Sequence, residues 1–450
     1  MTAENGQRPG GLTLWHLMMA LPWVAVGIVA RGQIRDNSFL WHIRAGSLQT
    51  EMGQVLTTDP FSFTRLGAPW RTQSWLAELG YAWGERTWNL AYVPWMVAAA
   101  ALMLFSALAI IAYRRLRSPL GVTVYLVLST ILVVGFLNPR PVIFSYPLFA
   151  LLVLADDDRR LRWSLPLLLW VWAALHGSFI IGLGYLGLQW IRRREWSRWP
   201  ELVACFIAVN LTAHGFGIWD VLVEFLGAGE ALNNITEWAH PDLLTLPMFP
   251  LLLAIFGMFV GFWRGRLGPR DLWVVIPFLT LAFTGNRSVP PAWIGLSFFV
   301  TAGLEELGRV RTSRGTIKTP AAAVVALAIL IIPLVVPREQ GIDPGVFPVE
   351  AAELLTADRV FHDDGAGGYL IYSQWPERQV YVDDRAELYG QVLVDFVKAR
   401  GGMAVWHDVF EEYDIEQVLL RPDDPLVETL NQVGWHEIYR SEDFVLLNPA

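Results

Sequence analysis

The sequence has few charged residues and almost no cysteine. Only 17% of its 450 residues are Asp, Glu, Lys or Arg, whereas 54% are hydrophobic. An ordinary soluble protein carries about 25% charged residues. The single cysteine, Cys205, excludes an intramolecular disulfide framework. Because the missing charge is concentrated in apolar runs rather than spread evenly, the composition argues against a soluble protein and indicates a polytopic α-helical membrane protein.

Eleven apolar runs are expected to cross the membrane, although several are shorter than the ~20 residues that a perpendicular helix needs. They are residues 12–30, 91–113, 120–137, 142–155, 165–175, 179–191, 202–213, 244–263, 272–283, 292–304 and 321–336. The N-terminal stretch MTAENGQRPGG lacks the charged, apolar and small-residue order of a cleaved signal peptide. We therefore expect the first run to be a retained anchor.

Clusters of arginine predict the orientation of these helices, because cytoplasmic loops carry the excess of Lys and Arg. If residues 165–191 form two helices rather than one, all the short Arg-rich loops fall on one side. Their cations are Arg114, Arg115, Arg117, Arg159, Arg160, Arg162, Arg192, Arg193, Arg194, Arg198, Arg264, Arg266, Arg270, Arg309, Arg311, Arg314 and Lys318. This arrangement predicts a multi-pass protein of the plasma (inner) membrane with a cytoplasmic N-terminus and an extracytoplasmic C-terminal domain.

The short loops on the opposite, outer side have few cations. Residues 214–242 contain no Lys or Arg, and the short outer loops hold only Arg140, in LNPRPV, and Arg287, in TGNRSVPP. Other ionisable residues on this outer side, including the longer first loop, are Asp36, His42, Arg44, Asp59, His176, His214, Glu237, His240 and Asp242. Their collection at one membrane face predicts a cavity that opens there.

The chain divides into a transmembrane domain, residues 1–336, and a C-terminal extracytoplasmic α/β domain, residues 337–450. In the second, RVFHDDGAGGYLIYSQWPERQVYVDDRAELYG predicts short strands joined by Gly-containing turns. QVLVDFVKARGGMAVWHDVFEEYDIEQVLL predicts helices followed by a strand, and WHEIYRSEDFVLLN predicts a hairpin. The GAGG within the first stretch is too short for a nucleotide-binding fingerprint.

The first extracytoplasmic loop, residues 31–90, interrupts the apolar runs early. Residues Phe39, Leu40, Ile43 and Leu48 predict an amphipathic helix lying on the membrane surface, followed by a turn at TTDPFSF. APWRTQSWLAEL then places two tryptophans where a membrane interface suits them.

The layout of this loop resembles that of the GT-C superfamily of glycosyltransferases. An acid directly after the first span, an interfacial helix ending at Gly, a Pro-containing turn and a WL-containing helix are similar to the first loop of protein mannosyltransferases and of aminoarabinose transferases acting on lipid A. RDNSFLWHIRAG, TDPFSFTRLGAPW and SWLAEL resemble more closely a bacterial group of GT-C-like membrane proteins without an assigned reaction. The resemblance extends to NPRPVIFSYPLF, LHGSFIIGLG, ITEW, NRSVPP, GGYLIY and VDDRAELYG.

This resemblance implies transfer of a sugar from a polyprenyl-phosphate donor to a cell-envelope glycan, lipid or protein at the outer membrane face. The first-loop acid of such enzymes matches Asp36, which would act as general base on the acceptor hydroxyl. A guanidinium group stabilises the charge that develops on the departing phosphate. We assign that role to Arg140 and Arg287, with Arg44 as a weaker candidate; the alternative for Arg140 and Arg287 is that they bind lipid headgroups.

The sequence departs from the wider GT-C pattern at two points. Many members have two adjacent acids in the first loop, whereas Asn37 follows Asp36 here, and the outer side has no DxD before the C-terminal domain. A divalent metal is therefore unsupported, no metal site is assigned, and no cofactor is predicted. The acidic run at residues 156–158 is expected to be a solvated loop. A net charge of −8 disfavours nucleic-acid binding.

Several residues have two interpretations. Asp59 either forms the TTDPFSF turn or lines the site, and His176 is either a satisfied residue at a helix end or part of the site. His42 and Glu237 are further candidates to line a substrate cavity. Asp383, Asp384 and Arg385 either contact an acceptor glycan or form a buried pair that fixes the C-terminal domain.

Two other functions remain open at this point. The main alternative is a non-catalytic GT-C-fold protein that binds polyprenyl-linked glycan or lipid during envelope assembly. A transporter is less favoured, because the sequence shows neither two corresponding hydropathy halves nor charged residues in the middle of a span.

Overall fold

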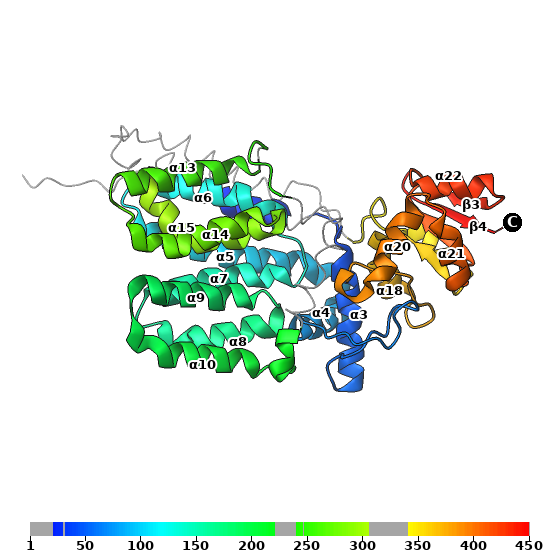
Figure 1. The fold of residues 1–450 in the computed structure, drawn as a ribbon, viewed down its shortest axis with the longest axis horizontal. Helices are drawn as coiled ribbons and strands as arrows, with labels where there is room; N and C mark the ends of the chain where they lie inside the picture. Colours follow the sequence, from blue (N-terminus) through cyan, green and yellow to red (C-terminus); the bar gives the residue numbers. More distant parts are fainter. Residues whose placement is uncertain (1–20, 30–31, 221–239, 246, 306–340, 450) are drawn as a thin grey trace, which may run out of the picture.

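The computed structural model of the chain describes residues 21–29, 32–220, 240–245, 247–305 and 341–449. Over these residues the chain is mostly helical, with a small sheet near the C-terminus (Figure 1). A helical bundle is followed along the chain by this C-terminal domain, and residues 32–88 lie at the junction (Figure 1). The bundle helices are α2 (Leu21–Val29), α5 (Val93–Arg115), α6 (Pro119–Val133), α7 (Val142–Asp157), α8 (Leu165–Leu175), α9 (Phe179–Arg193), α10 (Trp199–Asn210), α13 (Phe249–Trp263), α14 (Leu272–Phe283) and α15 (Val289–Leu304).

These ten helices correspond to ten of the eleven expected spans, and the last, residues 321–336, lies outside the described residues. The prediction of two helices within 165–191 is confirmed, since α8 ends at Leu175 and α9 begins at Phe179. Among the described residues, only the continuous helix Trp75–Arg115 is both long and apolar enough to cross a membrane. Shorter apolar helices cover Leu120–Phe136, Arg162–Leu175 and Phe249–Trp263.

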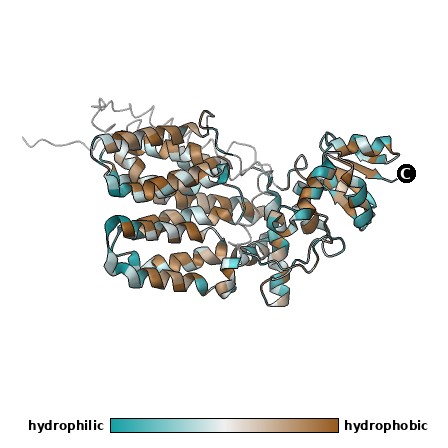
Figure 2. Cartoon of the chain, in the orientation of Figure 1, coloured by the Kyte–Doolittle hydropathy of each residue, from teal (hydrophilic) through white to brown (hydrophobic). Residues whose placement is uncertain are grey.

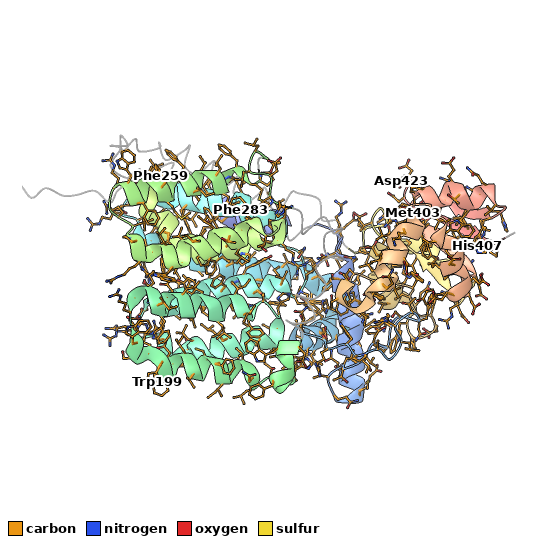
Figure 3. All side chains as sticks on the ribbon, viewed as in Figure 1. Trp199, Phe259, Phe283, Met403, His407 and Asp423 are labelled. Atoms are coloured by element: carbon orange, nitrogen blue, oxygen red, sulfur yellow. The ribbon has the colours of Figure 1, made fainter. Side chains whose placement is uncertain are left out.

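The bundle is apolar inside and over much of its surface. In its core, Trp293 of α15 donates to Ser129 Oγ of α6 at 2.9 Å, and Tyr125 donates to Ser297 Oγ at 2.7 Å. Large apolar side chains are also exposed on the outside, such as Trp199 and Phe259 on opposite surfaces (Figures 2 and 3). Others are Leu102, Met103, Ile110, Leu167, Val203, Phe206, Ile207, Leu253, Phe256, Trp273 and Ile276.

The Arg-rich loops within the described residues gather at the end of the bundle farthest from the C-terminal domain (Figure 2). Arg192 pairs with Asp271 at 2.8 Å, so the loops after α9 and α13 meet there. The expectation of a solvated loop at residues 156–158 is wrong for Asp156. Its carboxylate is fully buried and pairs with Arg193 at 3.1 Å and Arg198 at 2.8 Å, because a buried charge requires partners of opposite sign.

The C-terminal domain contains a four-stranded sheet in the order β1-β2-β4-β3. β1 (Val360–His362) runs parallel to β2 (Gln417–Leu420), whereas β4 (Val445–Asn448) is antiparallel to both β2 and β3 (His436–Arg440). The predicted hairpin at WHEIYRSEDFVLLN is therefore confirmed. The remaining helices are α17 (Val349–Glu353), α19 (Ala386–Tyr389), α20 (Gln391–Arg400), α21 (Val405–Glu412) and α22 (Pro425–Gln432).

The prediction of strands and turns through GAGGYLIY is wrong, because residues Asp364–Gln374 form helix α18. Asp363 caps its start by accepting from the Gly365 N–H at 2.8 Å. The glycines serve close packing rather than turns. A Cβ at Gly367 would lie 2.3 Å from the Val382 carbonyl oxygen, and one at Gly368 would lie 2.1 Å from the Asn37 carbonyl oxygen. Tight contact with distant segments thus outweighs the low helix propensity of glycine.

The first loop forms helices α3 (Asn37–Met52) and α4 (Trp75–Trp88), and α4 continues through a short 3-10 turn into α5. α3 runs across the end of the bundle between α4 and α18 (Figure 1). The expected helix and its end at a glycine are confirmed, since Gly53 caps α3 in the left-handed conformation. Its residues 38–43 are buried against protein, however, so α18 covers much of the surface expected to face the bilayer.

Candidate functional site

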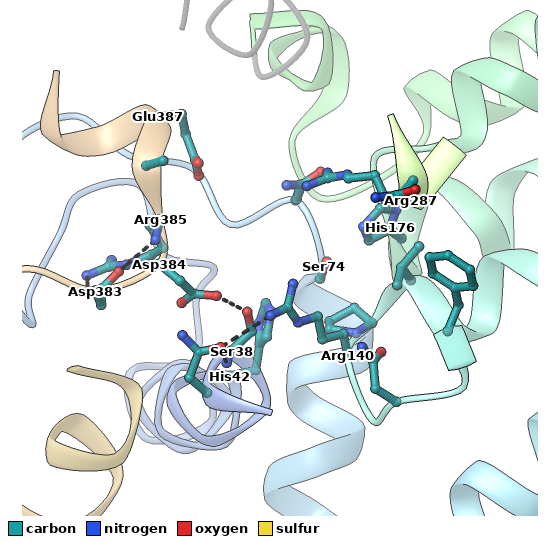
Figure 4. A pocket seen from close by; sticks show the side chains of 18 of the residues that line it. Ser38, His42, Ser74, Arg140, His176, Arg287, Asp383, Asp384, Arg385 and Glu387 are labelled. Atoms are coloured by element: carbon teal, nitrogen blue, oxygen red, sulfur yellow. Dashed lines mark hydrogen bonds and ion pairs between the residues drawn. The ribbon is translucent and has the colours of Figure 1, made fainter. Parts of the chain in front are cut away.

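A cavity of about 1080 Å³ lies where the bundle, the first loop and the C-terminal domain meet (Figure 4). Each part contributes polar side chains to its lining. They include Asn37, Ser38, His42, Thr72 and Gln73 of the first loop, Arg140, His176, His240, Asp242 and Arg287 of the bundle, and Asp364, Asp383, Asp384, Arg385 and Glu387 of the C-terminal domain. The aromatic side chains of Trp41, Trp70, Phe136 and Tyr146 complete the lining. The predicted gathering of polar residues around one cavity is thus observed in part. The cavity is lined by His42, Arg140, His176, His240, Asp242 and Arg287, but not by Asp36, Arg44, Asp59 or His214.

Asp36 and Arg140 form an ion pair at the edge of this cavity. One oxygen of Asp36 accepts from the Phe39 N–H at 3.1 Å and caps α3, while the other accepts from Arg140 Nε at 2.5 Å. Arg140 Nη2 also donates to Asn37 Oδ1 at 3.2 Å. The LNPRPV turn before α7 therefore holds the guanidinium against the start of α3. Arg140 lines the cavity, whereas Asp36 lies behind it and is 8% exposed.

Asp384 is the carboxylate that the C-terminal domain places in the cavity. Its Oδ1 accepts from Trp41 Nε1 at 2.8 Å, and its Oδ2 accepts from the Ser38 hydroxyl, so both oxygens contact α3 (Figure 4). Burial, opposed by the charge of Arg140 and assisted by the neighbouring Asp383 and Asp36 carboxylates, raises the pKa of Asp384 to about 7. Such a carboxyl exchanges its proton near neutral pH.

Arg385 fixes this segment onto the first loop. Its guanidinium pairs with Asp383 at 2.5 Å and with Asp59 at 2.8 Å, and it lies over the Trp70 ring at 4.5 Å. Burial raises the pKa of Asp383, but the Arg385 charge more than offsets this effect and holds that pKa below its ordinary value. Asp383 and Arg385 border the cavity, but their charges neutralise each other. The buried-pair interpretation is therefore the one the geometry favours.

His42 is oriented by a buried glutamate. Its Nδ1 lies 2.8 Å from Glu78 Oε1, and Glu78 also accepts from Gln49 at 2.5 Å and from the Thr72 hydroxyl. Glu78 is fully buried, so these three partners together satisfy its charge. The close crossing of α3 and α4 that makes this possible depends on Gly46, where a Cβ would lie 1.9 Å from the Glu78 carbonyl oxygen.

His176 and Arg287 lie on the bundle side of the cavity (Figure 4). His176 follows the end of α8, and its Nδ1 accepts from the Ser178 N–H at 3.1 Å. Burial, with additional repulsion from Arg287 and His42, lowers the pKa of His176 to about 3. The imidazole is therefore neutral at physiological pH, and the bundle side of the cavity gains its positive charge from arginine.

Besides Asp36, two predicted site residues do not line the cavity, and a third lies outside the described part of the chain. Arg44 turns toward α18, where its Nε donates to the Tyr372 carbonyl oxygen at 2.8 Å, and it does not line the cavity. Asp59 accepts from the Phe61 and Ser62 N–H groups, both at 3.1 Å, as the turn interpretation expects, and is 1% exposed. Glu237 lies outside the described residues.

Sequence reasoning missed Glu78 and did not separate the roles of the two acids in VDDR. Glu78 stands in SWLAEL with no local pattern to distinguish it from a surface acid. The two adjacent aspartates take different partners in the structure. Asp383 accepts from the buried Arg385, while Asp384 accepts from Trp41 of α3.

Within the described residues, no group of three or more His, Cys, Asp or Glu side chains is arranged to hold a metal ion. The guanidinium groups of Arg140 and Arg287 line the bundle side of the cavity, and such groups bind anionic oxygens. The sequence matches no protein-family model and has no significant match among curated proteins.

Proposed function

We propose that this protein is a membrane glycosyltransferase of the GT-C type, which transfers a sugar from a polyprenyl-phosphate donor to a cell-envelope glycan, lipid or protein. The observation that carries the proposal is the cavity shared by three parts of the chain, in which arginine, carboxylate and aromatic side chains meet. The resemblance of the motifs quoted above supports the choice of family, and the charged and aromatic lining of the cavity supports the choice of reaction.

The bundle surface supports a membrane location. Phe259 is 58% exposed and Trp199 61% exposed, and they belong to a wide apolar surface around the helices. An exposed apolar surface of this extent marks contact with lipid or with a partner. The Arg-rich end of the bundle is the end farthest from the C-terminal domain, which helps to line the cavity, as a cytoplasmic end would be under the positive-inside rule. We place the protein in the plasma (inner) membrane, with the cavity and C-terminal domain outside.

The donor fits the cavity through its charge. Arg140 projects from the turn before α7, and Arg287 from a short 3-10 turn, Asn286–Ser288, before α15. Two guanidinium groups on one cavity wall can neutralise a lipid phosphate and stabilise the additional charge it gains as the sugar leaves. His176, being neutral, adds hydrogen-bonding capacity without charge. Trp41 and Trp70 also line the cavity, with Trp41 stacked on His42 and Trp70 beneath the Arg385 guanidinium.

Sugar transfer also needs a carboxylate that accepts the proton of the attacking hydroxyl. The resemblance assigns this role to Asp36. In the structure Asp36 pairs with Arg140 and caps α3, and Asp384 is a second acid close by. Both acids are therefore candidates for a role in the proposed reaction, and their different contacts favour different roles.

The proposal is tested with purified protein in lipid nanodiscs and a panel of radiolabelled polyprenyl-phosphate sugars, with extracted envelope material as acceptor. We expect wild type to transfer label from at least one donor, and Arg140→Gln with Arg287→Gln to weaken donor binding at least tenfold. Arg264→Gln is the matched control, because Arg264 lies at the opposite end of α13. Donor binding without transfer in every combination would instead favour the non-catalytic glycolipid-binding function.

A further inference from the structure

We propose that Asp384, supplied by the C-terminal domain, is the group that removes the proton from the acceptor hydroxyl, and that Asp36 is a positioning residue for Arg140. This assignment rests on the proposed sugar transfer and deepens it. It makes the C-terminal domain part of the catalytic site rather than an accessory domain.

The two acids differ in their position relative to the cavity. Asp384 lines the cavity, and the hydrogen bonds from Ser38 and Trp41 hold its carboxylate in one orientation. Asp36 is oriented away from this role, because one oxygen caps α3 and the other contacts Arg140 Nε at 2.5 Å. A carboxylate engaged with both a helix terminus and a guanidinium is a weak proton acceptor.

The surrounding structure also fixes Asp384 from both sides. Its neighbour Arg385 is locked by Asp383 and Asp59, which fastens the segment to the first loop. Gly368 allows α18 to touch the start of α3, where Ser38 lies. A catalytic group has to be held within a fraction of an ångström, and these contacts provide that support.

The charged groups around Asp384 also favour it as the proton acceptor. The charged groups that face Asp384 are Arg140 from the bundle, Asp36 from the first loop and Asp383 from its own segment, while Glu387 and Asp364 of neighbouring helices line the same cavity. With a pKa of about 7, Asp384 is ionised often enough to accept a proton and basic enough to hold it. The buried pairing of Asp36 gives it no comparable advantage.

The acceptor oxygen attacks the anomeric carbon and forms the new glycosidic bond while its proton moves to a carboxylate oxygen of Asp384. The bond between the anomeric carbon and the phosphate oxygen breaks, and its electron pair leaves with the polyprenyl phosphate. Arg140 and Arg287 stabilise that charge. Asp384 then returns its proton to water.

The test compares single-turnover transfer by wild type, Asp384→Asn, Asp384→Glu and Asp36→Asn, together with donor affinity. Asp423→Asn is a matched control, because Asp423 is an exposed acid of the same domain. We expect Asp384→Asn to slow transfer by about a hundredfold or more with donor affinity nearly unchanged, since that is the contribution of a general base. Asp384→Glu should restore part of the rate.

Asp36→Asn should behave differently. Because it releases Arg140, it should weaken donor binding and keep the rise of rate with pH around 7, whereas Asp384→Asn should lose that rise. Transfer by Asp384→Asn at the wild-type rate, or loss of the pH-dependent rise in Asp36→Asn alone, would overturn the assignment and leave sugar transfer standing. Absence of transfer by wild type would overturn both.

Discussion

Arg140 Nε lies 2.5 Å from Asp36 Oδ2, across a sequence separation of 104 residues. The pair joins the turn before α7 to the first residue that caps α3. It therefore links the orientation of a cavity guanidinium to the packing of the first loop on the bundle. A change at either residue is expected to affect the other.

Removal of either partner should reveal this coupling. We expect a double-mutant cycle of Asp36→Asn and Arg140→Gln, measured by thermal unfolding, to give an interaction free energy of about 1–3 kcal/mol. The physical reason is that each single variant leaves a partly buried group without its charged partner. Arg71→Gln with Asp220→Asn provides the matched control, because that pair is much more exposed. Equal coupling in the two pairs would contradict the structural role.

The Arg385 cluster is expected to hold the C-terminal domain in place. Arg385→Gln should lower the free energy of unfolding by about 3 kcal/mol or more, because it leaves the buried carboxylates of Asp383 and Asp59 without a counter-charge. Arg440→Gln removes an exposed pair with Glu437 and should cost less than about 1 kcal/mol. Tryptophan fluorescence during unfolding measures both. If Arg385→Gln lowers the free energy of unfolding by no more than Arg440→Gln does, the Arg385 cluster does not hold the C-terminal domain in place.

Asp384 should make stability depend on pH. Its carboxyl has a pKa of about 7 in the folded chain, against 3.8 when unperturbed, so the folded state binds the proton more tightly between these values. The stability of wild type relative to Asp384→Asn should therefore fall as pH rises from about 4 to about 7, and then level off. Melting temperatures measured across this range provide the test. A constant difference would show that Asp384 does not titrate as described.

The membrane orientation can be tested by cysteine labelling. After Cys205→Ala, we expect Glu442→Cys in the C-terminal domain to react with a membrane-impermeant maleimide in intact cells. Arg160→Cys at the opposite, Arg-rich end should react only after the cells are opened. Both positions are exposed in the structure, so accessibility of the folded protein is not limiting. Labelling of Arg160→Cys in intact cells would refute the proposed topology.

Local patterns in the sequence predicted much of the fold. Apolar runs located the bundle helices, and the distribution of arginine correctly divided residues 165–191 into α8 and α9. Where the structure depends on distant partners, local patterns failed. α18 is a helix despite its glycines because they allow contact with Asn37 and Val382, and Asp156 is buried because Arg193 and Arg198 reach it.

The candidate site was predicted in its bundle part and less well elsewhere. Arg140, Arg287 and His176 were identified because cations and polar groups are scarce on outer loops, and all three line the cavity. The contact of Asp384 with Ser38 spans 346 residues, and no local pattern reports such a pairing. Buried partners such as Glu78 cannot be predicted either, because the sequence does not show whether water or a histidine forms the hydrogen bonds of an acid.

The proposed function is the transfer of a sugar from a polyprenyl phosphate to an acceptor within the cavity. The most direct measurement is product analysis after wild type in proteoliposomes consumes a doubly labelled donor, with one label in the sugar and another in the lipid. The account predicts glycosylated acceptor and free polyprenyl phosphate in equal amounts. Recovery of intact donor alone, although the protein binds it, would contradict the account.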